Sequence, residues 1–201
     1  MNNLFFVSGP HGGGKTTLLD KLSRADSRIL IPELETTTPK FHTEPLERMI
    51  LKICQRPIEN YETLEIAEKN PDKIIIGNRC IYDAQVYTKA YFKIGWITEK
   101  DRYDLETLNK TIHLAFPERL RNPKAIVLNP PFDVVKQRLE GRWMKKEKKW
   151  NEDNLDYLRA ACEEYEVYRE NPNVLYLEDN GDVERVLEWL SDSFQLHEQN
   201  I

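Results

Sequence analysis

Residues 9–16 read Gly-Pro-His-Gly-Gly-Gly-Lys-Thr, and this stretch decides the fold. It satisfies the pattern G-x-x-x-x-G-K-[ST]. An apolar run over residues 4–7 precedes it and predicts a buried strand. From Lys15 onward Leu18, Leu19 and Leu22 recur at helical spacing and predict a helix. A strand, a glycine-rich turn and a helix in this order predict a phosphate-binding loop.

The residue types in the loop suit an anionic ligand. Glycines let backbone amides turn toward anionic oxygens, and the start of a helix adds positive potential at the same point. Lys15 is expected to reach the outer phosphates, and the hydroxyl of Thr16 to bind Mg²⁺. His11 is expected to be solvated or positional rather than a catalytic base. We therefore expect ATP with magnesium, held by Gly9, Gly12, Gly13, Gly14, Lys15, Thr16 and Thr17.

The rest of the chain alternates strands with helices. Further strands are predicted over residues 28–32, 73–76, 125–128 and 174–177. Helices are predicted over residues 46–68, 82–91, 100–112, 132–144, 154–169 and 183–194, the first broken or kinked near Pro57. The pattern predicts one α/β domain over residues 1–201, a five-stranded parallel sheet with helices on both faces and ligands at the carboxyl ends of the strands.

Composition narrows the classes of partner. The chain is 40% hydrophobic and 31% charged with a formal net charge of -5, so no strong attraction to nucleic acid or anionic lipid is expected. Cys54, Cys80 and Cys162 show no paired spacing, which indicates neither a disulfide framework nor a zinc site. No apolar run approaches eighteen residues, and the first strand leaves no room for a targeting segment. A cytoplasmic protein without a membrane span is expected.

Two predicted strands end in residues that suit phosphoryl transfer. Glu33 and Glu35 follow the second strand, where a carboxylate can accept the proton of an attacking hydroxyl or hold magnesium. Asn78 and Arg79 end the third strand, where an arginine can clamp a phosphate or orient a substrate oxygen. A solvated strand end and a surface ion pair are the alternatives for these residues.

A basic cluster follows the fourth strand and its helix. Cations there can fold over a triphosphate and stabilise the charge of a transferring group, which predicts a lid over about residues 138–153. A solvated helix face is the alternative. The cluster consists of Arg138, Arg142, Lys145, Lys146, Lys148 and Lys149, with Glu147 inside it.

These features resemble the deoxynucleoside kinase family, the nucleoside-phosphorylating relatives of thymidylate kinase, over roughly residues 4–190. In that family an acidic-Arg-Ser motif after the third strand runs on as Ile-Tyr, and here Asn78-Arg79-Cys80-Ile81-Tyr82 stands in that place. The family lid has two arginines four residues apart and a glutamate five beyond, a spacing that Arg138, Arg142 and Glu147 reproduce. The resemblance implies a P-loop kinase fold with a basic lid.

The sequence departs from the family pattern at four positions. Asn78 replaces the acidic residue of the motif, whose role then falls to Glu33, Glu35 or nothing, and Cys80 replaces the serine. Ala84 stands where some members carry an aspartate that selects cytosine or purines, which leaves room for thymine or a broad range of bases. Met144 stands in the place of a third lid arginine, with nearby lysines as substitutes.

The resemblance implies transfer of the ATP γ-phosphoryl group to the 5′-hydroxyl of a deoxynucleoside. Glu33, the closer match to the family base, is expected to accept the hydroxyl proton and, with Thr16, to bind magnesium. Arg79, Lys15, Arg138 and Arg142 are expected to orient the oxygen and stabilise the transition state. Substrate contacts are expected from Gln55, Arg79, Tyr82 and Glu147, with Tyr61, Tyr82 or Phe41 stacking on the base. A homodimer is expected from the family.

Two alternatives stay open at this point. A kinase of nucleoside monophosphates, like thymidylate kinase, or of another small ribosyl compound would need a further cationic pocket, for which residues 40–56 can serve. A regulatory P-loop NTPase or nucleotide-dependent binding protein would hydrolyse nucleotide without an acceptor, and the neutral Asn78 favours this idea.

Overall fold

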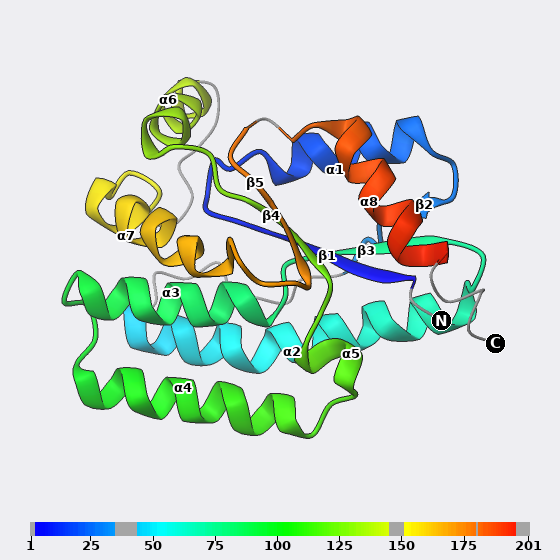
Figure 1. Cartoon of the computed structure of the whole chain (residues 1–201). Helices are drawn as coiled ribbons and strands as arrows, with labels where there is room; N and C mark the ends of the chain where they lie inside the picture. The colour runs from blue at the N-terminus through cyan, green and yellow to red at the C-terminus, as the bar shows by residue number, and fades with distance from the viewer. Residues whose placement is uncertain (1–2, 35–43, 145–150, 180, 196–201) are drawn as a thin grey trace.

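The computed structural model of the chain describes residues 3–34, 44–144, 151–179 and 181–195. Within these residues the strands form one parallel sheet in the order β2-β3-β1-β4-β5 (Figure 1). The five-stranded parallel sheet predicted from the sequence is confirmed. The strands are β1 (Leu4–Ser8), β2 (Ile29–Leu30), β3 (Ile74–Asn78), β4 (Ala125–Leu128) and β5 (Val174–Leu177).

Helices cover both faces of the sheet (Figure 1). On one face lie α1 (Lys15–Ala25) and α8 (Val183–Gln195). On the other lie α2 (Pro45–Lys69), α3 (Ile81–Lys93) and α7 (Leu155–Tyr165), with α4 (Glu99–Leu114) packed outside α2 and α3. The remaining helices are the short α5 (Glu118–Arg121), α6 (Phe132–Trp143) and the 3₁₀ turn η1 (Glu166–Tyr168).

The apolar strand residues divide between the two layers. Phe5 and Val7 pack with α1 and α8, whereas Leu4 and Phe6 pack with α2, α3 and α7. All five residues of β1 are buried, as expected for a parallel strand with helices on both faces. This double coverage explains why the strands read as continuous apolar runs.

Several predicted boundaries are corrected. Of the break or kink expected near Pro57, the break is wrong, because α2 runs as one helix through that residue. Proline removes one backbone hydrogen bond, but a buried stripe that includes Ile53 and Leu64 holds the helix on both sides of it. The second strand has two residues rather than five, α5 was not predicted, and the α-helix expected over 154–169 gives way to η1 at Glu166.

The carboxyl end of β1 is where the sheet positions a ligand. β1 lies between β3 and β4. The chain passes from β1 to β2 and β3 on one side and then crosses from β3 to β4 on the other, so a crevice opens outside the end of β1. Gly9 follows directly with a φ of 141°, and a Cβ there would lie 2.1 Å from the carbonyl oxygen of Leu128. Only glycine therefore lets the loop pass so close to β4.

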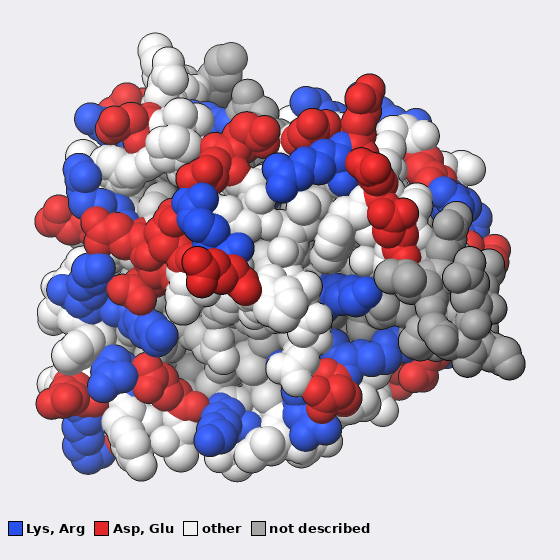
Figure 2. Space-filling view, in the orientation of Figure 1, with Lys and Arg blue, Asp and Glu red and all other residues white. Residues whose placement is uncertain are grey.

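No described helix is both long and apolar enough to cross a lipid bilayer. Figure 2 shows Lys and Arg side chains interspersed with Asp and Glu over the viewed face. This face carries no field of a single sign.

Candidate active site

The phosphate-loop motif folds as a turn that leads into α1. Gly14 precedes the helix with a φ of 99°, a left-handed conformation that favours glycine. Lys15 begins α1, and its ammonium donates to the carbonyl oxygens of Gly9 at 2.9 Å and Pro10 at 2.8 Å. The lysine charge is thus held over its own loop, at the positive end of the helix.

A cavity of about 710 Å³ opens in front of this loop. Among its lining residues, six are cationic and one is a carboxylate, so its potential is positive. Such a cavity suits a polyphosphate. We call it the phosphate cavity; it is lined by His11, Gly12, Gly14, Lys15, Thr16, Thr17, Lys21, Lys52, Asn78, Arg79, Arg138, Leu139, Arg142 and Glu152.

Both predicted lid arginines lie on α6 and face the loop. The Arg138 guanidinium donates to the carbonyl oxygens of Gly13 at 3.1 Å and Gly12 at 3.3 Å. Arg142 forms an ion pair with Glu152, whose side chain is wholly buried. The structure thus brings Arg138 and Arg142 to the phosphate cavity, while Glu147 and the lysines of residues 145–149 lie outside the described residues.

His11 joins the loop to Glu152. Its Nδ1 lies 3.3 Å from a carboxylate oxygen of Glu152, and its ring packs at 5.7 Å from that of Tyr87 and 6.1 Å from that of Tyr157. Burial, aided by the charges of Arg79 and Lys15, lowers the pKa of His11 to about 4. The imidazole is therefore neutral, with Nδ1 facing the Glu152 carboxylate. No sequence signal marked Glu152.

A second, smaller cavity of about 120 Å³ adjoins the first. His11, Lys52 and Arg79 line both, so a ligand in one meets a ligand in the other at these side chains. We call it the acceptor pocket; it is lined by His11, Arg48, Met49, Lys52 and Arg56, by Arg79, Asp83, Ala84, Tyr87 and Tyr91, and by Tyr157.

The acceptor pocket is lined by aromatic side chains and by cationic side chains. Tyr87, Tyr91 and Tyr157 offer ring faces that can pack against a flat base. Arg48, Lys52 and Arg56 recur every four residues on α2 and so share one face of that helix. Burial, then the charges of Arg56 and Arg48, lowers the pKa of Lys52 to about 8.

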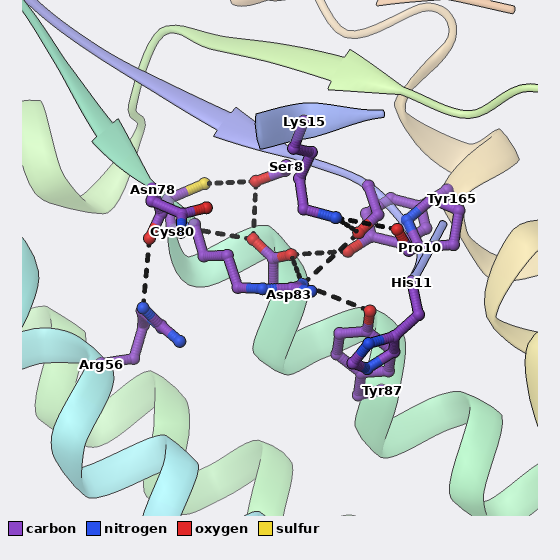
Figure 3. A network of polar contacts seen from close by, with 12 residues as sticks. Ser8, Pro10, His11, Lys15, Arg56, Asn78, Cys80, Asp83, Tyr87 and Tyr165 are labelled. Atoms are coloured by element: carbon purple, nitrogen blue, oxygen red, sulfur yellow. Dashed lines mark hydrogen bonds and ion pairs between the residues drawn. The ribbon is translucent and has the colours of Figure 1, made fainter. Parts of the chain in front are cut away.

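Arg79 lines both cavities and pairs with Asp83, which lines the acceptor pocket. Figure 3 shows Asp83 with Ser8, Cys80 and Tyr165 around it. The Arg79 guanidinium donates to Asp83 Oδ1 at 2.5 Å, to the Tyr87 hydroxyl at 3.2 Å and to the Gly9 carbonyl at 3.4 Å. Burial raises the pKa of Asp83, but Arg79 together with hydrogen bonds from Ser8 and Tyr165 outweighs burial, so the pKa lies below its ordinary value. The carboxylate is ionised, and sequence reasoning had missed it.

Other predicted site residues line neither cavity. Glu33 is exposed beyond β2, and Glu35 and Phe41 lie outside the described residues. Gln55 donates to Glu59 at 2.7 Å. Tyr82 is buried in the core, with its hydroxyl donating to Pro123 at 3.0 Å and its ring 4.4 Å from that of Tyr168. The tyrosines at the pocket are instead the three named above, two of them four residues apart on α3.

The donor set fits a magnesium ion that arrives with a nucleotide. Magnesium keeps several waters and takes only one or two protein oxygens besides substrate phosphates. The Thr16 hydroxyl, which lines the phosphate cavity, would supply one. Among the described residues no three His, Cys, Asp or Glu side chains gather as a closed metal site.

The sequence model of the deoxynucleoside kinase family matches residues 5–193. The chain belongs to the deoxynucleoside kinase family. Its activity is therefore that of a kinase of deoxynucleosides, as the resemblance implied. No curated protein sequence matches the chain.

Solved structures agree in fold. Deoxyadenosine kinase from M. mycoides with bound dATP superposes with a TM-score of 0.67 at 14% identity, covering 95% of this chain and 98% of that one. The same enzyme with bound dCTP gives a TM-score of 0.60 at 15% identity over 96% and 98% of the two chains. The P-loop kinase fold of this deoxynucleoside kinase is thereby confirmed.

The structure locates the four residues that depart from the family pattern. Asn78 lines the phosphate cavity and Ala84 the acceptor pocket, where its small side chain leaves room. Cys80 is buried, burial raises the pKa of its thiol to about 12, and its sulfur lies 3.4 Å from the Ser8 hydroxyl. Met144 is 88% exposed at the end of α6, so it takes no part in the described site of this deoxynucleoside kinase.

Proposed function

We propose that the chain transfers the γ-phosphoryl group of ATP to the 5′-hydroxyl of a deoxynucleoside. The observation that carries this proposal is the joining of two cavities of different character. One is cationic beside a phosphate loop, and the other is smaller, aromatic and lined by Arg79 and Asp83. A donor in the first and an acceptor in the second would meet at Arg79.

The donor side is supported by charge and by hydrogen-bond donors. Gly9, Gly12, Gly13 and Gly14 shape the loop, and Lys15 and Thr17 would contact the phosphates. Magnesium held by Thr16 would neutralise charge that develops on the transferring group. Arg138 and Arg142 would stabilise the same charge from α6.

The acceptor side is supported by shape. Tyr87, Tyr91 and Tyr157 would pack against the base, and Arg79 would orient the sugar oxygen toward the phosphate cavity. The space beside Ala84 favours more than one base. Glu33 remains the proposed proton acceptor and second magnesium ligand, and Gln55 and Glu147 remain proposed substrate contacts. Tyr82 is buried in the core, so the three pocket tyrosines take the contact expected of it.

The test is a panel of acceptors at fixed ATP and magnesium. Purified protein is assayed for transfer of labelled γ-phosphoryl to thymidine, deoxycytidine, deoxyadenosine and deoxyguanosine and to their 5′-monophosphates. We expect nucleoside monophosphates as products. Lys15→Ala is the matched negative control and should lower turnover by about 100-fold or more, because it removes one cation from the transferring group.

A nucleoside monophosphate kinase is the second candidate. It is favoured by one observation, the face of α2 that places Arg48, Lys52 and Arg56 on the acceptor pocket. Arginine and lysine there suit an acceptor that already carries a phosphate. Products that are diphosphates, formed from the monophosphates alone, would replace the first proposal with this one. Hydrolysis that no acceptor stimulates would point instead to a regulatory NTPase.

A further inference from the structure

Arg79 holds an unusual backbone conformation. Its φ is 75°, in the left-handed region, and among the described non-glycine residues only Asn151 shares this feature. Such a conformation persists where the surroundings fix the residue. Two contacts fix the backbone: the Arg79 amide donates to the Val7 carbonyl at 2.8 Å, and the Asn60 side chain donates to the Arg79 carbonyl at 2.9 Å.

The guanidinium is fixed chiefly by Asp83, one turn along α3. This carboxylate is 3% exposed. One oxygen, Oδ2, accepts from the Ser8 hydroxyl at 2.6 Å and from the Cys80 amide at 3.0 Å. The other, Oδ1, accepts from Arg79 at 2.5 Å and from the Tyr165 hydroxyl at 2.7 Å. Groups from β1, from the turn before α3 and from α7 therefore converge on a single carboxylate (Figure 3).

These four bonds decide which role the carboxylate has. A carboxylate offers about four lone-pair sites, and all four are engaged here. Asp83 thus has no site left for a substrate proton or a metal ion. Its position and its negative charge are fixed, and the role left to it is to hold the cation with which it pairs.

We propose that Asp83 is the positioning residue for Arg79, anchoring its guanidinium between the phosphate cavity and the acceptor pocket. The motif position before Arg79 is the neutral Asn78, so the carboxylate that pairs with Arg79 in this chain is Asp83, inside α3. The role of Arg79 in this proposal rests on the proposed function. The way it is held rests on the four hydrogen bonds to Asp83.

A double-mutant cycle with chemical rescue tests the proposal. The Arg79 variant is Arg79→Gly, because glycine suits the left-handed backbone. We expect Asp83→Asn to lower kcat by about 100-fold with the KM for ATP nearly unchanged, since a misplaced catalytic group costs about that factor. Combined with Arg79→Gly it should cause no further loss. Millimolar guanidinium chloride should partly restore Arg79→Gly and leave Arg79→Gly/Asp83→Asn unrestored.

A matched control is available in α4. Asp83 also closes the capping box of α3, and Asp101 occupies the same N3 position in the capping box of α4, where it is only half-buried. Asp101→Asn therefore removes an equivalent helix-capping carboxylate and should leave kcat and its guanidinium response unchanged. The Tm of every variant shows how much of each decrease in kcat comes from unfolded protein.

Three results would overturn the proposal: additive losses in the cycle, no rescue of Arg79→Gly, or equal rescue with and without Asp83. If the wild-type protein phosphorylates no deoxynucleoside, the proposed function fails instead. The position of Arg79 in a crystal structure of Asp83→Asn then decides this inference by itself, and an undisplaced guanidinium would refute it.

Discussion

A neutral histidine in the phosphate loop couples folding to pH. The pKa of His11 is about 4 in the folded protein and 6.5 ordinarily, because burial disfavours the imidazolium. Between these values the unfolded chain binds the proton and the folded chain does not, so the free energy of unfolding falls as pH falls from 6.5 toward 4. The loss is up to about 3 kcal/mol, at 1.36 kcal/mol per pKa unit.

Chemical denaturation at a series of pH values checks this expectation. His11→Gln keeps a hydrogen-bonding side chain but has no proton to take up, so its stability should fall less steeply over the same interval. Parallel curves for the two proteins would show that His11 does not carry the effect. His113, whose pKa burial also lowers, is unchanged in both proteins and cancels in the comparison.

Glu33 gives a second prediction at this scale. If it accepts the hydroxyl proton, Glu33→Gln should lower kcat by about 100-fold or more, because general base catalysis contributes 10²- to 10⁴-fold. The affinity for ATP measured without magnesium should stay, since the phosphate cavity does not include Glu33. Equilibrium binding of a fluorescent ATP analogue and single-turnover assays measure the two quantities. Unchanged turnover would remove Glu33 from the mechanism.

At the scale of elements, α6 links the lid to the loop. Arg138 donates from this helix to the carbonyl oxygens of Gly12 and Gly13, which places its charge at the phosphate cavity. Arg138→Leu should lower kcat by about 100-fold, the usual effect of removing one group that stabilises a transition state. Steady-state kinetics with the preferred acceptor give the value. Lys136→Leu, on the same helix but paired at the surface with Glu140, should leave kcat unchanged.

Local signals predicted most elements, and tertiary contacts account for the rest. The apolar run before Gly9 and the leucines after Lys15 carry their own periodicity, so β1 and α1 were found from the sequence. The break at Pro57 was wrong because propensity is local, whereas the buried stripe on α2 acts through distant residues. The length of β2 likewise depends on its single neighbour, β3.

The same division holds for the site. Lys15, Arg79, Arg138 and Arg142 carried motif spacing, and the structure brings all of them to the phosphate cavity. Asp83 and Glu152 carried no such spacing, because their partners lie on other elements and meet them only in the folded chain. The tyrosines of the acceptor pocket also carried no motif spacing. They lie on α3, which precedes β4 in the chain, and on α7, which follows it, and only the fold brings them together.

At the scale of the whole molecule, ligand binding should raise thermal stability. A ligand at about 100 times its Kd adds roughly 2.7 kcal/mol, which corresponds to a rise in Tm of about 5–11 °C for a chain of this size. We expect this shift with ATP and magnesium for the wild-type protein, and a smaller one for Lys15→Ala. Differential scanning fluorimetry measures both. Equal shifts in the two proteins would argue against the phosphate loop as the nucleotide site.

The expected homodimer stays a prediction at this scale. Light scattering coupled to gel filtration gives the mass in solution, which a single chain sets at 23.8 kDa. A mass near twice this value would agree with the prediction, and a mass of one chain over a range of concentrations would contradict it.

The hydrogen bonds from the Lys15 ammonium to two loop carbonyls affect the enthalpy of nucleotide binding. Because the lysine already donates to Gly9 and Pro10, an incoming phosphate trades one set of oxygen acceptors for another. Calorimetry should consequently register only a modest enthalpy from this side chain, and most of its benefit should emerge later, as negative charge migrates during bond cleavage.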